Sequence, residues 1–461
     1  DEDLTKTQKI GETFQWALSH SKLEDLQELT ESKSATKKLR DDRPDFSKYS
    51  NAELFDQYLQ LLKLHRKYFS QHIFTTYMAT VPVGIISGVA NAVGRPDLLL
   101  PIIAGFGEVD SAEPSHAMWD MGRLVRSDDD LTDEFEKGIV GLIDRLLQSE
   151  SPEASEFLKA FEHFIYEYGS RGPNEWEARS PSWETRPELA LNAIDRMRLA
   201  GDELAPKTQN AERATQREQA AAELLSMVEA DPAVHGELAV GIAASAAWLP
   251  ARERTKTNNI RLIHEMRMIM RAIGARMVEK NAFDEIEDFG FVTEEEYASL
   301  FKEPTSMLNI IRSRRDEYYK LLEREAQFLF DGQADHPDTW RRRDAVSEDV
   351  LREGEALQGM PGCTGSAEGT ARVILDSNDP TSLQPGDILV APLTDPSWTP
   401  LFVPAAAVVV DVGAPLSHAI IVSRELGIPC VVSATDATRR IPDGARINVN
   451  GDTGVITVLE V

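Results

Sequence analysis

The chain has 461 residues, which is too long for one ordinary hydrophobic core and predicts two or three domains. Its composition, 42% hydrophobic and 27% charged residues without a run of about 18 apolar positions, is typical of a soluble globular protein and predicts no membrane span. The formal net charge of −28 repels polyanions, so we expect neither nucleic acid nor an anionic membrane as a partner.

The chain from about residue 10 to residue 330 is predicted to be largely α-helical. It opens with DEDLTKTQKIGETF, which lacks the basic start and apolar run of a secretory signal, so a cytoplasmic location is expected. Apolar residues recur at helical spacing in NAELFDQYLQLLKLHRKYF from Asn51, LTDEFEKGIVGLIDRLL from Leu131 and AERATQREQAAAELLSMV from Ala211. Segments rich in Pro, Gly and Asp, such as RDDRPDFSKYS and SRGPNEWEARSPSWETRPE, separate these helices.

The pattern changes after Phe330, and residues 332–356 are polar and irregular, as expected of a linker. Short β-rich runs follow from Leu357: ARVIL at 371, DILVAP at 387, AAVVVDVG at 406, CVVSA at 430 and a hairpin within ARINVNGDTGVITVLE. The stretch SHAIIVSREL between them is predicted to be a helix. We therefore expect a multi-domain α + α/β fold, with a helical domain over residues 1–331 and a smaller β-rich domain over residues 357–461.

The two cysteines, Cys363 and Cys430, lie in the β-rich part without the spacing of metal ligands. We expect buried free thiols there and predict no metal site in this chain.

His418 is the residue of this sequence best placed for chemistry. A neutral imidazole is a nucleophile near pH 7, and its phosphorylated form can pass the phosphoryl group onward. His418 opens the predicted helix directly after GAPLS, where free backbone N–H groups and the helix dipole favour a dianion. Gly413 and Ser417 are the candidate phosphate-binding residues, with Ser417 either capping the helix or donating to phosphoryl oxygens. Taken alone, a histidine in the first turn of a helix is more often idle.

The sequence around His418 resembles a known domain. GAPLSHAIIVSRELGIPCVV, preceded by GDILVAPLTDPSWTPLF and followed by PDGARINVNGDTGVITVL, closely resembles the mobile phosphohistidine domain of the phosphoenolpyruvate-utilising enzymes. The resemblance implies a compact swivelling β/β/α fold and assigns His418 as the phosphoryl carrier. Ala414 stands where this family usually has a second glycine. Asp395, in the second matching segment, is a candidate for orienting the histidine, and a turn-forming Asp before Pro396 is the alternative.

The arrangement of the chain points to one branch of that family. Only 43 residues follow His418, whereas a β/α barrel for pyruvate or phosphoenolpyruvate would need about 250. The first 330 residues lack a Gly-rich phosphate loop in a strand–turn–helix context. A helical domain followed by a carrier domain is similar instead to rifampicin phosphotransferases and to the phosphotransferases that make phenylphosphate or methylbenzyl phosphate. This resemblance implies that ATP and Mg²⁺ bind on an ATP-grasp-containing partner subunit or on an ATP-binding domain missing from this chain.

Two helical segments extend the resemblance to the acceptor-binding domain of that group. YGSRGPNEWEARSPSWETRPELAL from Tyr168 and ARERTKTNN from Ala251 resemble its motifs, and the second implies catalytic roles for Arg252, Glu253 and Lys256 facing the phosphohistidine. Arg252 and Lys256 are one turn apart on a predicted helix and could neutralise a transferring phosphoryl group, with Glu253 holding them or taking a proton. A solvated helix face with ordinary ion pairs is the alternative.

The remaining candidates concern the acceptor. Arg171 and Glu175 either contact the substrate or form a salt bridge that holds their loop. His72, His116 and His264 could each act as a base toward a hydroxyl, although an idle role is commoner; His264, two turns beyond Lys256, is the preferred substrate-site candidate. The apolar segment from Thr80, TVPVGIISGVANAVGRPDLLLPIIAGFG, either walls an aromatic pocket or packs in the core.

The working hypothesis is a phosphotransferase subunit that carries a phosphoryl group on His418 and delivers it to a small aromatic hydroxyl compound, a phenol by preference. Two alternatives remain open: a fragment of an antibiotic phosphotransferase of the rifampicin type, and a non-catalytic regulatory or scaffold protein that keeps the carrier fold.

Overall fold

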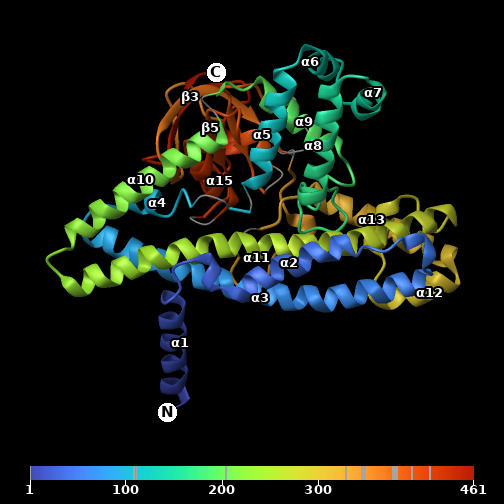
Figure 1. The fold of residues 1–461 in the computed structure, drawn as a ribbon, viewed down its shortest axis with the longest axis horizontal. Helices are drawn as coiled ribbons and strands as arrows, with labels where there is room; N and C mark the ends of the chain where they lie inside the picture. The colour runs from blue at the N-terminus through green and yellow to red at the C-terminus, as the bar shows by residue number, and fades with distance from the viewer. Residues whose placement is uncertain are drawn as a thin grey trace.

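The computed structural model describes residues 2–461 except for 107–108, 111, 203–204, 328–329, 344–348, 376–382, 396–397 and 415–416. A long helical part precedes a C-terminal part built on a mixed β-sheet (Figure 1), which confirms the predicted α + α/β class. The helices of the first part are α1 (Glu2–Leu18), α2 (Gln27–Asp41), α3 (Asn51–Ala92), α4 (Leu99–Ile102), α5 (Glu113–Arg126), α6 (Asp129–Glu136), α7 (Leu142–Gln148), α8 (Pro152–Tyr168), α9 (Glu188–Leu199), α10 (Pro206–Met227), α11 (Pro232–Glu279), α12 (Tyr297–Lys302) and α13 (Leu308–Leu322).

The long helices α3 and α11 lie antiparallel and form the rod at the bottom of Figure 1, with α2 beside them. Leu54, near the start of α3, belongs to the same buried cluster as Ile273, near the end of α11. Ile86, near the end of α3, packs in a cluster with Leu238, near the start of α11. Because both helices are long, residues of α3 and α11 lie opposite one another over many turns.

Local sequence signals start both helices of the rod. Ser50 and Glu53 form a reciprocal capping box at the start of α3. The Asp231 carboxylate accepts two backbone N–H groups in the first turn of α11. Each helix runs through an internal proline, Pro82 in α3 and Pro250 in α11, because packing against the partner helix outweighs the local loss of one backbone hydrogen bond.

Helix α3 also meets the length and composition criteria of a membrane-crossing helix, the one helix of the described residues to do so. The core helices of soluble proteins can meet the same criteria. The apolar segment from Thr80 lies partly on this helix, where Ile86 and Ala90 are buried against α4, α10 and α11. The portion of the segment that lies on α3 therefore packs in a core.

The segment from Leu131 is largely helical, as predicted, but it is divided. The structure has two short helices there, α6 and α7, separated by a turn. Gly138 and Gly141 adopt φ angles of 92° and 72° within it, a left-handed backbone that breaks an α-helix. Apolar spacing continues across the turn because both helices bury one face in the same cluster with α5, α8 and α9.

The C-terminal part contains an eight-stranded sheet in the order β1-β8-β7-β3-β4-β5-β6-β2. Strands β3 to β6 run parallel at its centre, and the predicted hairpin is the antiparallel pair β7 and β8. The predicted runs form strands as expected, whereas β1 and β2 were not predicted. The elements are β1 (Ala356–Gln358), β2 (Met360–Cys363), β3 (Ser366–Val373), β4 (Ile388–Ala391), α14 (Thr399–Phe402), β5 (Ala407–Val410), α15 (His418–Leu426), β6 (Cys430–Val432), α16 (Ala437–Arg440), β7 (Arg446–Asn450) and β8 (Val455–Glu460).

The C-terminal part, hereafter the carrier domain, is docked on the helical part. One hydrophobic cluster runs from α5, α8 and α9 into the sheet and α14, joining for example Ile194 to Phe402. Helix α15 packs against α10, and the Arg196 guanidinium donates to the carbonyl of Leu383 at 2.7 Å. In Figure 1 the carrier domain accordingly lies above the rod, between α10 and α5.

The predicted linker is partly structured. Arg324 and Arg342 form an antiparallel β-bridge, so the chain folds back on itself before the carrier domain. Arg341 bridges Glu325 to Asp436 of the carrier domain, at 2.9 and 2.7 Å. Residues 344–348 lie outside the described part, and the carrier core begins at Leu351. The expected free thiols of the two cysteines are confirmed, and both are buried.

The packing of α11 predicts the sign of a Gly274→Ala substitution. Ala is normally favoured over Gly within a helix by about 1 kcal/mol. A Cβ at position 274 would lie 2.3 Å from the carbonyl oxygen of Ile286, so the substitution forces backbone to shift and we expect a net loss of about 1–3 kcal/mol of unfolding free energy.

Gly236→Ala is the matched control in the same helix, because nothing lies within 4 Å of its added Cβ. Urea unfolding should show this variant equal to the parent or up to about 1 kcal/mol more stable. Equal behaviour of the two variants would contradict the close packing of α11 on Ile286.

Candidate functional site

The candidate site is built around the first turn of α15. His418 is the first residue of this helix, Ser417 precedes it in an extended conformation (φ −71°, ψ 156°), and Gly427 ends it in the left-handed region. Backbone N–H groups at the start of a helix have no intrahelical partner and favour an anion. The predicted helix and the place of the histidine on it are therefore confirmed, and the imidazole lies at an end that suits a phosphoryl group.

The imidazole of His418 is partly exposed and oriented by its own domain. Its Nδ1 lies 3.1 Å from Oγ1 of Thr394, just after β4, and Phe402 packs edge-on at a centroid distance of 5.8 Å. Asp395, the sequence candidate for this orienting role, directly follows Thr394. The Asp395 carboxylate accepts the backbone N–H of Asn174 at 2.7 Å, across the boundary between the two parts.

The charges of three cations of the helical part act on this histidine. Burial and the positive charges of Lys256, Arg171 and Arg252 lower the pKa of His418 well below its ordinary value. Lys256 and Arg252 come from α11, and Arg171 comes from the loop between α8 and α9. The ring is therefore neutral at pH 7, as a nucleophile must be.

A buried carboxylate holds two of these cations in place. Arg171 Nε lies 2.6 Å from one oxygen of Glu175, and Lys256 Nζ lies 3.1 Å from the other. Burial opposes the ionisation of Glu175, yet the charges of Arg171 and Lys256 prevail and lower its pKa. The salt-bridge alternative for Arg171 and Glu175 is thus realised, and it fastens their loop to α11.

Arg252 is held differently, by an ion pair with the adjacent carboxylate of Glu253. Its Nε is buried and has no hydrogen-bond partner in the described part of the chain. The same is true of Oγ of Ser417, which occupies the N-cap position of α15 without making a capping bond. Each part of the protein thus has one unpartnered donor near the first turns of α15.

The two parts meet closely at this point. A small pocket of about 30 Å³ has Arg252 and Glu253 of α11 on one side and Ile421 of α15 on the other. Gly413 lies at the base of the turn before α15, where an added Cβ would approach Cβ of Val432 to 2.6 Å. Close packing explains this glycine.

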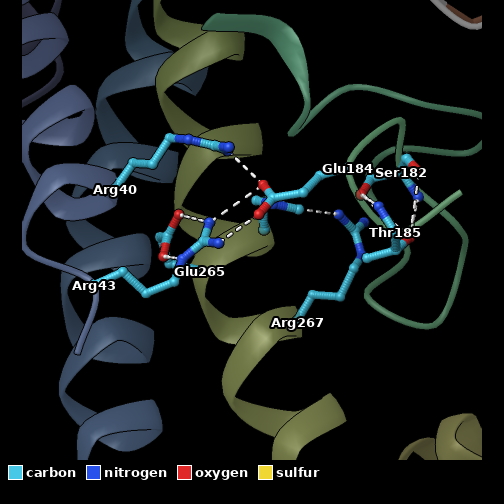
Figure 2. Close-up of polar contacts among 8 residues, drawn as sticks. Arg40, Arg43, Ser182, Glu184, Thr185, Glu265 and Arg267 are labelled. Atoms are coloured by element: carbon cyan, nitrogen blue, oxygen red, sulfur yellow. Dashed lines mark hydrogen bonds and ion pairs between the residues drawn. The ribbon is translucent and has the colours of Figure 1, made fainter. Parts of the chain in front are cut away.

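His264 lies in a separate buried cluster of charges. Its Nδ1 accepts from Arg267 at 3.0 Å, so its Nε2 carries the proton and donates to Glu184 at 2.7 Å. Figure 2 shows Arg40 and Arg43 reaching the same Glu184, with Arg43 also paired with Glu265. Both nitrogens of His264 are engaged within this cluster.

Of the other histidines, His72 lies beside the cations. It contacts Thr255 of α11 at 3.0 Å, and its titration is coupled to Arg252, Glu253 and Lys256. The helical spacing of the sequence could not reveal this, because His72 comes from α3. Among the described residues, no group of three or more His, Cys, Asp or Glu side chains is arranged to hold a metal.

The electrostatic origin of the low pKa of His418 is testable with Lys256→Gln. Removing this positive charge makes the imidazolium less unfavourable, so the pKa of His418 should rise toward the ordinary value. An NMR titration of the His418 ring measures it. Lys207→Gln, which removes an exposed ion pair with Asp120, is the control and should leave this pKa unchanged; a pKa of His418 that is equally insensitive to Lys256 would contradict the assignment.

Comparison with known proteins agrees with this geometry. Residues 71–253 match the family model of the rifampicin phosphotransferase fourth domain, and residues 383–454 match that of the mobile domain of the PEP-utilising enzymes. The first match contains Arg171, Glu175 and Arg252, and the second contains His418.

The similar curated proteins are longer than this chain. A rifampicin phosphotransferase of Streptomyces sviceus is 32% identical over 342 residues, 72% of this chain and 36% of the relative. An uncharacterized phosphotransferase of Bacillus subtilis is 28% identical over 356 residues, 76% of this chain and 42% of the relative. A rifampicin phosphotransferase of Bacillus cereus is 36% identical over 189 residues, 40% of this chain and 20% of the relative. The chain is thus a relative of the rifampicin phosphotransferases that carries, at its C-terminal end, the mobile domain of the phosphoenolpyruvate-utilising enzymes.

Proposed function

We propose that this chain is the acceptor-binding and carrier portion of a phosphotransferase, in which His418 takes up a phosphoryl group and passes it to a hydroxyl. The observation that carries the proposal is the position of a neutral His418 imidazole at the start of α15, within the field of Arg171, Arg252 and Lys256 of the helical part. The names of the related phosphotransferases support it.

The chemistry of the transfer fits these residues. Thr394 engages Nδ1, so Nε2 is the nitrogen that we expect to form the N–P bond. A phosphoryl group there would meet the unpartnered Nε of Arg252 and Oγ of Ser417. Because the transition state of phosphoryl transfer is loose and spreads charge over the equatorial oxygens, fixed cations stabilise it more than covalent help does.

The donor reaction belongs to another chain or segment. We expect an ATP-grasp module with ATP and Mg²⁺ to phosphorylate His418, and the overall products to be AMP, inorganic phosphate and a phosphate ester. The carrier domain would swing away from α10 and α11 to be charged, on the segment before Leu351, and return to the docked position for transfer. A cytoplasmic location remains the expectation.

A small phenol is the acceptor that we propose. The second candidate is a large antibiotic acceptor, which the printed names of two of the relatives favour. A non-catalytic scaffold role is the third. The cations that act on His418 speak against it, because a scaffold would not need a neutral imidazole in a positive field.

Labelled ATP tests the carrier role. The full chain, mixed with a candidate ATP-grasp donor chain and ATP labelled in its β and γ phosphates, should acquire label that is labile to acid and stable to base, as a phosphoramidate is. His418→Ala should lose this label completely. Label that persists in the variant, or that never forms with any donor while the parent is folded, would contradict the carrier role.

The acceptor is tested on the labelled chain. Phenol and rifampicin, added separately, should differ in how fast they remove label from His418, and the expected product is the phosphate ester of phenol. Release by rifampicin alone would replace the phenol proposal with the antibiotic one. Equal loss of label with or without any hydroxyl compound would favour a non-catalytic role.

A further inference from the structure

His72 of α3 is buried against α11, and one of its ring nitrogens is engaged there. Only 8% of its surface is exposed, and its Nδ1 lies 3.0 Å from Oγ1 of Thr255 on α11. The Thr255 hydroxyl donates its one proton to the carbonyl of Arg252 at 3.0 Å. Oγ1 can then only accept from His72, so the imidazole proton sits on Nδ1 and the lone pair sits on Nε2.

That lone pair is available. No described residue forms a hydrogen bond with Nε2 of His72. Burial, with the positive charges of Arg252 and Lys256 and against the negative charge of Glu253, lowers the pKa of His72 to about 4. The ring is therefore neutral at every pH at which a phosphohistidine survives, and its basic nitrogen needs no prior deprotonation.

His72 and His418 flank the same two cations. Arg252 and Lys256 lower the pKa of both rings, although one ring belongs to α3 and the other to the carrier domain. Thr255, which His72 contacts, directly precedes Lys256 on α11, and Arg252 lines one small pocket with Ile421, one turn after His418 on α15. A hydroxyl bound between the two imidazoles would thus have a phosphoryl donor on one side and a proton acceptor on the other.

An aromatic surface adjoins His72. The Trp176 ring packs on the imidazole at a centroid distance of 5.7 Å and meets Phe69 edge-on at 5.9 Å. Both remain well exposed, Trp176 at 39% and Phe69 at 41%. Trp176 directly follows Glu175, the carboxylate that binds Lys256, so the aromatic surface is anchored to the cation site. Exposed aromatic side chains beside polar groups are typical of sites that bind flat apolar ligands.

We propose that Nε2 of His72 is the general base for the acceptor, and that the apolar body of an aromatic hydroxyl compound lies against Trp176 and Phe69. In the step, the acceptor O–H bond breaks and its proton goes to Nε2 of His72 while the oxygen bonds to phosphorus. The N–P bond breaks, and its electron pair returns to His418. The imidazolium of His72 then releases its proton to solvent. This inference rests on the proposed function.

Single-turnover transfer separates this step from charging. The full chain is phosphorylated chemically with phosphoramidate, His418→Ala serving to subtract label on other histidines, and phenol is then added. His72→Asn should charge as fast as the parent but transfer about 100-fold more slowly, the usual contribution of a general base. His163→Asn, an exposed histidine of α8, is the control and should transfer like the parent.

The pH profile distinguishes a base from a merely structural residue. Between pH 6 and 8 the parent rate should be flat, because a base with a pKa of about 4 is already deprotonated. The His72→Asn rate should instead rise with pH as phenol ionises in solution. A variant that is slower at all pH values by the same factor, or as fast as the parent, overturns the proposal.

An NMR measurement that does not depend on activity separates the role of His72 as a base from the proposed carrier role of His418. ¹⁵N NMR of the chain without phosphoryl group should show His72 protonated on Nδ1. Thr255→Val removes the oxygen that accepts this proton, so the proton should no longer be confined to Nδ1, while the thermal unfolding midpoint of the chain stays unchanged. A proton on Nε2 of the parent overturns the role of His72 whatever the transfer assay gives. Failure of His418 to charge would instead count against the proposed function alone.

Discussion

The site depends on one buried carboxylate. Glu175 joins Arg171 of its own loop to Lys256 of α11, and all three side chains are largely withdrawn from solvent. Removing one partner of such a group leaves an uncompensated buried charge, which costs about 3–5 kcal/mol. The arrangement therefore fixes two positive charges at a point where they act on His418, and it keeps them there before any phosphoryl group arrives.

Pre-positioned cations have opposite effects on the two states of His418. They disfavour the imidazolium, so the free ring stays neutral and nucleophilic, and they favour the dianionic phosphoryl group once it is attached. The docked carrier domain brings its ring into this field through the cluster that joins Ile194 to Phe402. Docking thus couples this apolar contact, in which Phe402 also packs on the imidazole, to the electrostatics of the transfer.

For the histidines of the helical part, distance from Lys256 along the sequence does not predict distance from it in the structure. His264 is eight residues beyond Lys256, and at 100° per residue it points about 80° away from it around α11. That rotation turns it toward Glu184 and Arg267, in the cluster of Figure 2. His72 is remote in sequence, but the antiparallel packing of α3 on α11 sets it against Thr255.

The sequence alone determined most of the carrier domain. Six of its strands, the helix that begins at His418 and the cation pair of Arg252 and Lys256 follow from local patterns and from short motifs. These are properties of neighbouring residues, which local backbone geometry converts directly into structure. The contact of Thr394 with Nδ1, the bridge through Glu175 and the position of His72 were decided only by the tertiary structure. Each depends on segments far apart in the chain, or on competition between packing and local preference, and no periodicity records which side chains meet across that distance.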